Sequence, residues 1–258
     1  MKEIHYLLGN SCNLNCDFCF WDLRVTDVSL AFKKRIVDQI IKTKIKRVTI
    51  SGGEPLCAGH FLEILEYMNK NNLEIILHTN GLKIDASLAK RLSTIVSRVS
   101  LAFDGANEET AIKMRKSRNI FQHTIFLVKI FHKLQIPVNV KTLVTKINQN
   151  QMIEIGNILK NLPIQYWSIL KFIPLNKGKI HKEKFFISQK DFDGICAKIQ
   201  EKFPSINIKI RDYSKNKNNY CFIAPNGDVY TYKENNGDIL IGNIETEELS
   251  AIISKIEK

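Results

Sequence analysis

The stretch Cys12-Asn-Leu-Asn-Cys16-Asp-Phe-Cys19 places three thiols within eight residues near the start of the chain. It follows the apolar run Ile4–Leu8, which predicts a short strand, so we expect the cysteines on the loop leaving that strand's carboxyl end. Thiolates are soft ligands that suit iron–sulfur clusters, zinc or copper. Because a cubane cluster has four irons, three cysteines would leave one iron open, as catalytic metal sites do.

Two simpler interpretations of the cysteines are weaker. A structural zinc site needs four ligands, and the nearest further candidates, Cys57 and His60, lie far along the chain with C-x2-H spacing. A disulfide framework is typical of secreted proteins, but Met1–Gly9 runs directly into the predicted strand and has no signal-peptide pattern. We therefore expect reduced cysteines and a cytoplasmic protein.

Two further motifs follow predicted strands. The run Arg47–Ser51 ends in Gly52-Gly53-Glu54-Pro55, where two glycines allow close approach of the backbone and the proline stiffens the turn. The run Leu73–Thr79 ends in Asn80-Gly81, which alone is a common turn.

Together these motifs resemble the signature of the radical S-adenosylmethionine (SAM) enzymes. The resemblance implies a [4Fe-4S] cluster that binds SAM at its open iron and cleaves it reductively to a 5′-deoxyadenosyl radical, which abstracts hydrogen from a substrate. It also implies the site residues: Cys12, Cys16 and Cys19 as cluster ligands, Gly52, Gly53, Glu54 and Pro55 at the SAM methionine, Phe18 near the adenine and Asn80 at the ribose end.

Strand and helix patterns alternate six times along the first part of the chain, which favours parallel strands joined by helical crossovers. The three motifs then share the carboxyl edge of the sheet, where such folds carry their sites. We predict an α/β fold, a partial (βα)6 TIM-type barrel over residues 1–180, with a small C-terminal α+β cap over residues 181–258. The predicted strands are Ile4–Leu8, Arg47–Ser51, Leu73–Thr79, Arg98–Phe103, Val138–Thr145 and Tyr166–Pro174.

The predicted helices between these strands begin near Ser29, an expected N-cap, His60, Ser87, Glu108 and Gln149, with the fourth in two parts. In the C-terminal region the pattern predicts a helix over Ser188–Lys202, a strand over Ile206–Arg211, a hairpin over Tyr220–Tyr232 that turns at Asn226-Gly227, and a last helix from Glu247.

Composition narrows the partners. The 258 residues carry a formal net charge of +12. Part of this excess is explained by lysine that is abundant throughout the chain, and the rest favours an anionic partner. No stretch approaches the ~20 apolar residues of a membrane span. Neither a helix-turn-helix nor an aromatic-interleaved basic stripe is present, so we expect no nucleic-acid or membrane partner.

The resemblance extends to the viperin-like nucleotide dehydratases, which dehydrate a ribonucleoside triphosphate to a 3′-deoxy-3′,4′-didehydro nucleotide in antiviral defence. Arg24 falls where that family carries a basic residue, and Tyr220 precedes a strand as a family tyrosine does. The chain departs from the family at Trp21-Asp22 and at Asn139-Val-Lys141. The implied substrate-binding residues are Arg24, Arg115, Lys116 and Lys141, with Tyr220 as a candidate catalytic residue and flavodoxin or ferredoxin as electron donor.

Two alternatives remain open. The stretch Tyr220–Tyr230 followed by Ile241-Gly-Asn-Ile resembles the C-terminal cluster domains of peptide-modifying radical SAM maturases, although Cys221 is the single cysteine there. A non-enzymatic or nucleic-acid-binding role is disfavoured by the intact cysteines and Gly-Gly-Glu-Pro motif.

Overall fold

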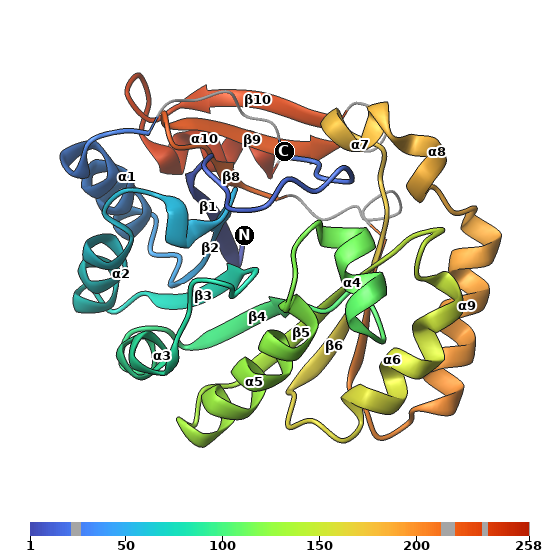
Figure 1. Ribbon diagram of the computed structural model, residues 1–258. Helices are drawn as coiled ribbons and strands as arrows, with labels where there is room; N and C mark the ends of the chain where they lie inside the picture. The colour runs from blue at the N-terminus through green and yellow to red at the C-terminus, as the bar shows by residue number, and fades with distance from the viewer. Residues whose placement is uncertain (22–26, 213–219, 234–236, 258) are drawn as a thin grey trace.

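A computed structural model describes residues 1–21, 27–212, 220–233 and 237–257 of the chain, and Figure 1 shows its arrangement. Strands and helices alternate through the first six strands, as predicted. The strands are β1 (Glu3–Gly9), β2 (Arg47–Gly52), β3 (Glu74–Thr79), β4 (Arg98–Ala102), β5 (Val138–Val144), β6 (Tyr166–Lys171), β7 (Ile208–Arg211), β8 (Phe222–Ile223), β9 (Asp228–Lys233) and β10 (Gly237–Asn243). The helices are α1 (Leu30–Lys42), α2 (Phe61–Lys70), α3 (Ala86–Leu92), α4 (Glu108–Arg115), α5 (Ile120–Lys133), α6 (Met152–Leu159), α7 (Asn176–Ile180), α8 (Lys182–Phe185), α9 (Gln189–Lys202) and α10 (Leu249–Ile256), with 3₁₀ turns η1 (Pro55–Cys57) and η2 (Gln149–Gln151).

All the described strands belong to one sheet, in the order β10-β9-β8-β1-β2-β3-β4-β5-β6-β7. Strands β1 to β7 are parallel neighbours in sequence order, and α1, α2, α3, α5, α6 and α9 lie around the outside of this sheet (Figure 1). The predicted α/β partial-barrel fold is therefore confirmed.

Side chains alternate along each strand between the helices and the barrel interior. In β1, Ile4, Tyr6 and Leu8 are fully buried in the hydrophobic core beneath the helices, together with apolar residues of α1 such as Ile36 and Ile40. The intervening residues of the strands therefore face the barrel interior. This alternation separates a helix-covered core from an interior that is free to carry polar groups.

Local signals set the element ends. The hydroxyl of Ser29 accepts a hydrogen bond from Phe32 N at the start of α1, which confirms the expected N-cap. The predicted two-part helix divides between Arg115 and Ile120, where Lys116 and Asn119 adopt left-handed backbone angles. The third strand begins one residue later than predicted, at Glu74, and the sixth ends at Lys171 rather than Pro174.

The C-terminal region extends both edges of the sheet. Strand β7 pairs in parallel with β6, and β8 pairs in parallel with β1 on the opposite edge. Strands β8 and β9 form the predicted hairpin, with Gly227 at a positive φ of 84° in its turn. The small α+β region expected after residue 180 is thus hydrogen-bonded into the main sheet, and a domain boundary at that residue stays a prediction.

Candidate functional site

The three cysteines lie on the coil that leaves β1, beside the carboxyl edge of the sheet. Cys12 is exposed, Cys16 is buried, and Cys19 is intermediate, with its backbone N–H donating to Cys16 O. Partial desolvation, and after it the charges of Glu54, Cys16 and Cys19, raises the pKa of Cys12 to about 11, and the hydrogen bond from Leu14 N opposes this shift. Cys16 and Cys19 oppose ionisation of Cys12, and a bound metal would favour its thiolate form.

No three His, Cys, Asp or Glu side chains among the described residues are arranged to share a single metal ion. A cubane cluster needs a different arrangement, in which each thiolate binds its own iron. Three soft donors on one short loop, mutually repelling when charged, fit that group.

The two glycines of the second motif are required by backbone packing. Gly52 has a φ of 129°, and a Cβ there would lie 2.4 Å from Gly9 O. A Cβ on Gly53 would lie 2.4 Å from Asn10 O and 2.5 Å from Ser11 O. Gly53 N and Glu54 N donate to Gly9 O and Ser11 O. The cysteine loop therefore rests directly on the Gly-Gly turn.

Glu54 joins the second motif to the third. Its side chain is buried, and its carboxylate accepts hydrogen bonds from Thr79 Oγ1 at 2.6 Å, Asn80 N at 2.8 Å and Leu56 N at 3.3 Å. Burial raises its pKa, and these donors oppose the shift. Asn80 in turn donates from Nδ2 to Asn13 Oδ1 at 2.8 Å. The three motifs thus form one hydrogen-bonded unit, in which Pro55 is buried at the start of η1.

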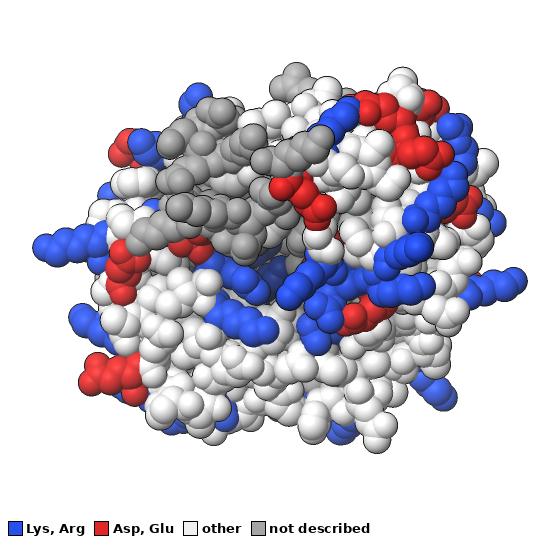
Figure 2. Space-filling model, turned by 180° about the vertical axis from the view of Figure 1, so that it is seen from behind, with Lys and Arg blue, Asp and Glu red and all other residues white. Residues whose placement is uncertain are grey.

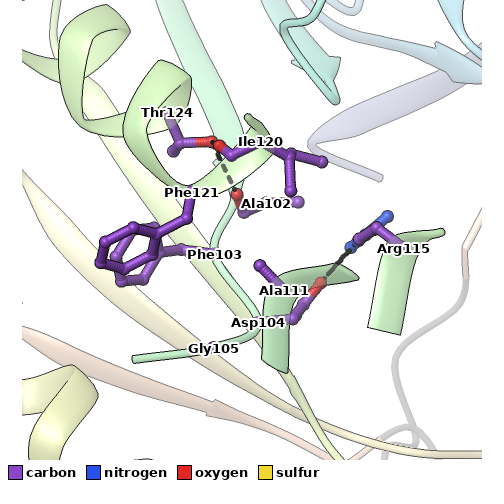
Figure 3. A pocket seen from close by; sticks show the side chains of 9 residues that line it. All are labelled: Ala102, Phe103, Asp104, Gly105, Ala111, Arg115, Ile120, Phe121 and Thr124. Atoms are coloured by element: carbon purple, nitrogen blue, oxygen red, sulfur yellow. Dashed lines mark hydrogen bonds and ion pairs between the residues drawn. The ribbon is translucent and has the colours of Figure 1, made fainter. Parts of the chain in front are cut away.

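Phe18 and Arg115 pack against each other beside Cys16. The Arg115 guanidinium lies 4.9 Å from the Phe18 ring centroid and pairs with the buried Asp104 at 2.6 Å. Arg115 and Asp104 line a narrow pocket of about 10 Å³, which has room for one water molecule, and Figure 3 shows the contact between them. Asp104 also accepts from Leu143 N, so Arg115 is held in place by a carboxylate that is itself anchored.

Lys116 lies at the cysteine loop rather than in the barrel. It pairs with Asp17, a largely buried carboxylate that also contacts Lys184 at 3.2 Å and His181 at 3.8 Å. Burial works against ionisation of Asp17, but the bonds from Lys116 and Lys184 lower its pKa. Arg24 lies outside the described residues.

Lys141 lies inside the barrel on β5, with its Nζ 2.9 Å from His78 Nδ1 on β3. Burial lowers the Lys141 pKa to about 7, with Glu3 acting against the shift and Arg211 adding to it. Burial also lowers the pKa of His5 on β1 to about 4 and that of His78 well below its usual value. These imidazoles are neutral near pH 7 and line the interior beside a lysine poised to gain or lose its proton.

Cationic and aromatic groups extend this interior. Burial and the nearby charges of Arg211, Arg98 and Arg47 lower the pKa of Lys209. Tyr220 packs against His5 and Phe222, with ring centroids 6.1 and 5.9 Å apart, and Trp21 lies 5.5 Å from Phe222. Figure 2 shows Lys and Arg side chains gathered beside a recess near the middle of the face turned away in Figure 1.

Of the site residues expected from the sequence, the structure brings together the cysteines, residues 52–55 and Asn80, with Phe18, Arg115 and Lys116 beside them. Lys141 and Tyr220 lie in the interior. Sequence reasoning missed His5, His78, Asp104, Arg211 and Phe222. His5, His78 and Arg211 alternate with apolar residues in predicted strands, and this alternation could have indicated that they face the barrel interior.

The family model of the radical SAM superfamily matches residues 6–161 of the chain. The chain belongs to the radical SAM superfamily. Radical SAM enzymes use a [4Fe-4S] cluster and SAM, and both are cofactors of this protein.

Curated relatives are distant. The chain is 26% identical over 215 residues to an AdoMet-dependent heme synthase of Methanosarcina barkeri, covering 81% of this chain and 61% of the relative. It is 21% identical over 262 residues to an S-adenosylmethionine-dependent nucleotide dehydratase of Flammeovirga pacifica, covering 92% of this chain and 84% of the relative.

Solved radical SAM structures share the fold. SuiB of Streptococcus suis bound to S-adenosylmethionine has a TM-score of 0.80 at 16% identity, covering 98% of this chain and 65% of SuiB. The enzyme anSMEcpe with bound AdoMet has a TM-score of 0.73 at 21% identity, and the match covers 97% of this chain and 80% of the anSMEcpe chain. This chain thus spans less than two thirds of the length of SuiB and of the heme synthase. Within the described residues, no helix is long and apolar enough to cross a membrane.

Proposed function

We propose that this radical SAM enzyme acts on a small anionic substrate inside the barrel, and that the substrate is a ribonucleoside triphosphate dehydrated to a 3′-deoxy-3′,4′-didehydro nucleotide, as in viperin-like antiviral defence. The observation that carries the proposal is the barrel interior, where Lys141 and Arg211 supply positive charge and the rings of Tyr220 and Phe222 stack with centroids 5.9 Å apart. Clustered cations suit phosphates, and aromatic rings suit a nucleobase.

In this proposal the cofactors carry out the radical chemistry, and residues of the barrel interior bind the substrate. The cluster and SAM, when bound, supply the abstraction of a hydrogen atom from the substrate. Lys141 gains a partner for its charge when an anion enters, and the Arg211 guanidinium adds further donors. Asn139 lies two residues before Lys141 on β5 and is fully buried, and its Oδ1 has no hydrogen-bond partner among the described residues.

The nucleotide dehydratase relative supports this choice because its match extends over most of both chains. A peptide substrate is the second candidate, favoured by the fold it shares with SuiB, which has been solved with the precursor peptide SuiA.

The test is an anaerobic assay of the reconstituted protein with SAM, dithionite and each ribonucleoside triphosphate in turn. One nucleotide should raise 5′-deoxyadenosine above the uncoupled background and be converted to a product that has lost water. The Lys141→Met variant should lose that stimulation, while Lys129→Met, at an exposed position of α5, should keep it. Stimulation by a peptide and by none of the nucleotides would contradict the proposal.

A control ties the chemistry to the cysteines. Replacement of Cys12, Cys16 or Cys19 by alanine should abolish the brown cluster absorbance and SAM cleavage together. Full cleavage by any one of these variants would contradict their assignment as cluster ligands.

A further inference from the structure

Helices α7 and α8 lie directly beside the cysteine loop. Gly178 N donates to Cys19 O at 3.3 Å, and Asn176 Nδ2 donates to Phe20 O at 2.6 Å. Figure 1 shows α7 next to the coil that follows β1. A molecule bound to this segment would therefore lie close to the cluster ligands.

This segment is strongly basic. The residues 176–186 contain four lysines and one acidic residue, Glu183. Lys184 contacts Asp17, and Lys177 donates to Asn15, so both are partly committed to the cysteine loop. Lys179 and Lys182 are exposed and make no ion pair within the described part of the chain, and Lys182 Nζ lies 5.0 Å from the centroid of the exposed Phe186 ring. Their charges are available to a partner.

Large apolar side chains are also exposed in this segment and at Phe20, whose carbonyl accepts a hydrogen bond from Asn176. Ile180 is 80% exposed, Phe186 43% and Phe20 45%. These are three of the six large apolar side chains exposed in the described residues. Large apolar groups among cations are typical of protein interfaces, whereas a phosphate or a nucleic-acid backbone would need the charges alone.

We propose that this α7–α8 surface, formed by Phe20, Lys179, Ile180, Lys182 and Phe186, binds a small acidic electron-transfer protein. The inference rests on the cluster chemistry of the proposed function and adds the place where its electron enters. The donor protein loses one electron and the cluster gains it, and no atom is transferred. Electron transfer falls steeply with distance, so docking against the loop that carries Cys19 suits this role.

Flavodoxin, an acidic FMN protein, is the probe for the test. The variant Lys179→Glu/Lys182→Glu reverses two charges that do not touch the cysteine loop, and Lys160→Glu/Lys198→Glu reverses two exposed lysines, one at the C-terminal end of α6 and one on α9. With reduced flavodoxin as electron source, the first variant should lose about ten-fold in kcat/KM for flavodoxin, and less at high salt. The second variant should stay within about two-fold of the wild type.

Dithionite needs no docking surface, so SAM cleavage driven by dithionite should be equal in all three proteins. Calorimetric binding of oxidised flavodoxin to the cluster-loaded protein provides a readout apart from turnover, and its Kd should rise about ten-fold in the first variant. Ile180→Ser should weaken binding without changing its salt dependence, because it removes apolar contact only.

Equal losses in the two double variants, or unchanged flavodoxin binding in Lys179→Glu/Lys182→Glu, would overturn the docking surface. A loss of affinity for an acidic peptide or for DNA, with flavodoxin binding unchanged, would overturn it as well. If dithionite drives no SAM cleavage even in the wild type, the proposed function fails, and the calorimetric comparison still decides the docking inference.

Discussion

At the scale of single residues, the cysteine loop is held by close packing against backbone atoms and by hydrogen bonds. Gly53 has no room for a methyl group because two carbonyl oxygens of the cysteine loop lie within 2.5 Å of the place a Cβ would take. Asn80 and Glu54 then fix the loop through side-chain hydrogen bonds. The geometry of the cluster ligands is therefore set by groups distant in sequence.

Gly53→Ala should displace the cysteine loop, lower the free energy of unfolding of the apo-protein by about 1–3 kcal/mol and reduce cluster content. Iron and sulfide analysis and urea unfolding measure these effects. Gly194→Ala is the matched control, since a Cβ there meets no atom within 4 Å. It lies inside α9 and should stabilise the protein by about 0.5–1 kcal/mol. Normal cluster loading in Gly53→Ala would argue against this account.

Lys141 should make binding of an anionic substrate depend on pH. With a pKa of about 7 in the free protein, Lys141 is charged below pH 7 and neutral above it. A bound anion favours the charged form, so binding takes up a proton above pH 7 and weakens by up to about ten-fold per pH unit. His5 and His78 stay neutral in this range, and Glu3 and Arg211 are the other charged groups that act on Lys141.

Nucleotide Kd values measured by calorimetry between pH 6 and 8.5 check this prediction. The dependence should vanish in Lys141→Met, whose affinity should be low at every pH. A wild-type Kd that is flat across this range would contradict a role for the Lys141 charge in binding.

At the scale of elements, β5 and β6 are joined by a buried side-chain hydrogen bond as well as by their backbone pairing. Trp167 on β6 is fully buried, and its Nε1 donates to Thr142 Oγ1 on β5 at 2.8 Å. Trp167→Ala should lower the free energy of unfolding by about 3–5 kcal/mol, because it leaves a cavity, although the Thr142 hydroxyl keeps its bond to Phe103 O.

Urea unfolding followed by circular dichroism measures this loss. Thr142→Val keeps the shape of the partner and should cost less than the tryptophan truncation. A Trp167→Ala protein as stable as the wild type would show that the core can close over the missing ring.

Most elements were predictable from sequence because their signals are local. The alternation of strands and helices, the Ser29 cap and the hairpin turn at Asn226-Gly227 are written in short stretches. The pairing of β8 with β1 and of β7 with β6 was not predicted, since nothing local in Phe222–Ile223 indicates which sheet edge it joins.

The motif residues of the site were predictable from the sequence, but most of their long-range contacts were not. Cys12, Gly53 and Glu54 stand in motifs with fixed spacing. The partners of Arg115 and Lys116 depend on how α4 turns over the cysteine loop, which brings Arg115 to Asp104 and Lys116 to Asp17. The Lys116–Asp17 contact joins residues 99 positions apart, and the sequence alone carried no signal for it.

At the scale of the whole molecule, one continuous sheet couples the two ends of the chain. Because β8 extends the edge of β1 and α10 packs on α1, residues after 180 complete the surroundings of the strand that carries the cysteine loop. The protein should therefore unfold in a single transition, with fluorescence and circular dichroism coincident.

SAM should raise the thermal midpoint of the cluster-loaded protein, since a ligand at 100 times its Kd stabilises the folded state by about 2.7 kcal/mol. For a chain of this size that corresponds to a shift on the order of 5–10 °C. Two resolved transitions, of which SAM moves one, would instead favour separate units divided near residue 180.

The alternation of side chains along the strands has a consequence for how such an enzyme can diversify. Gly53, Glu54 and Asn80, which fix the cysteine loop, lie just beyond the ends of β2 and β3, whereas His5, His78 and Lys141 lie within strands and point inward. Exchanging an inward residue therefore leaves the scaffold of the cofactors intact. A lineage can acquire a new substrate by changing alternate positions of β1, β3 and β5 while inheriting its radical chemistry unaltered.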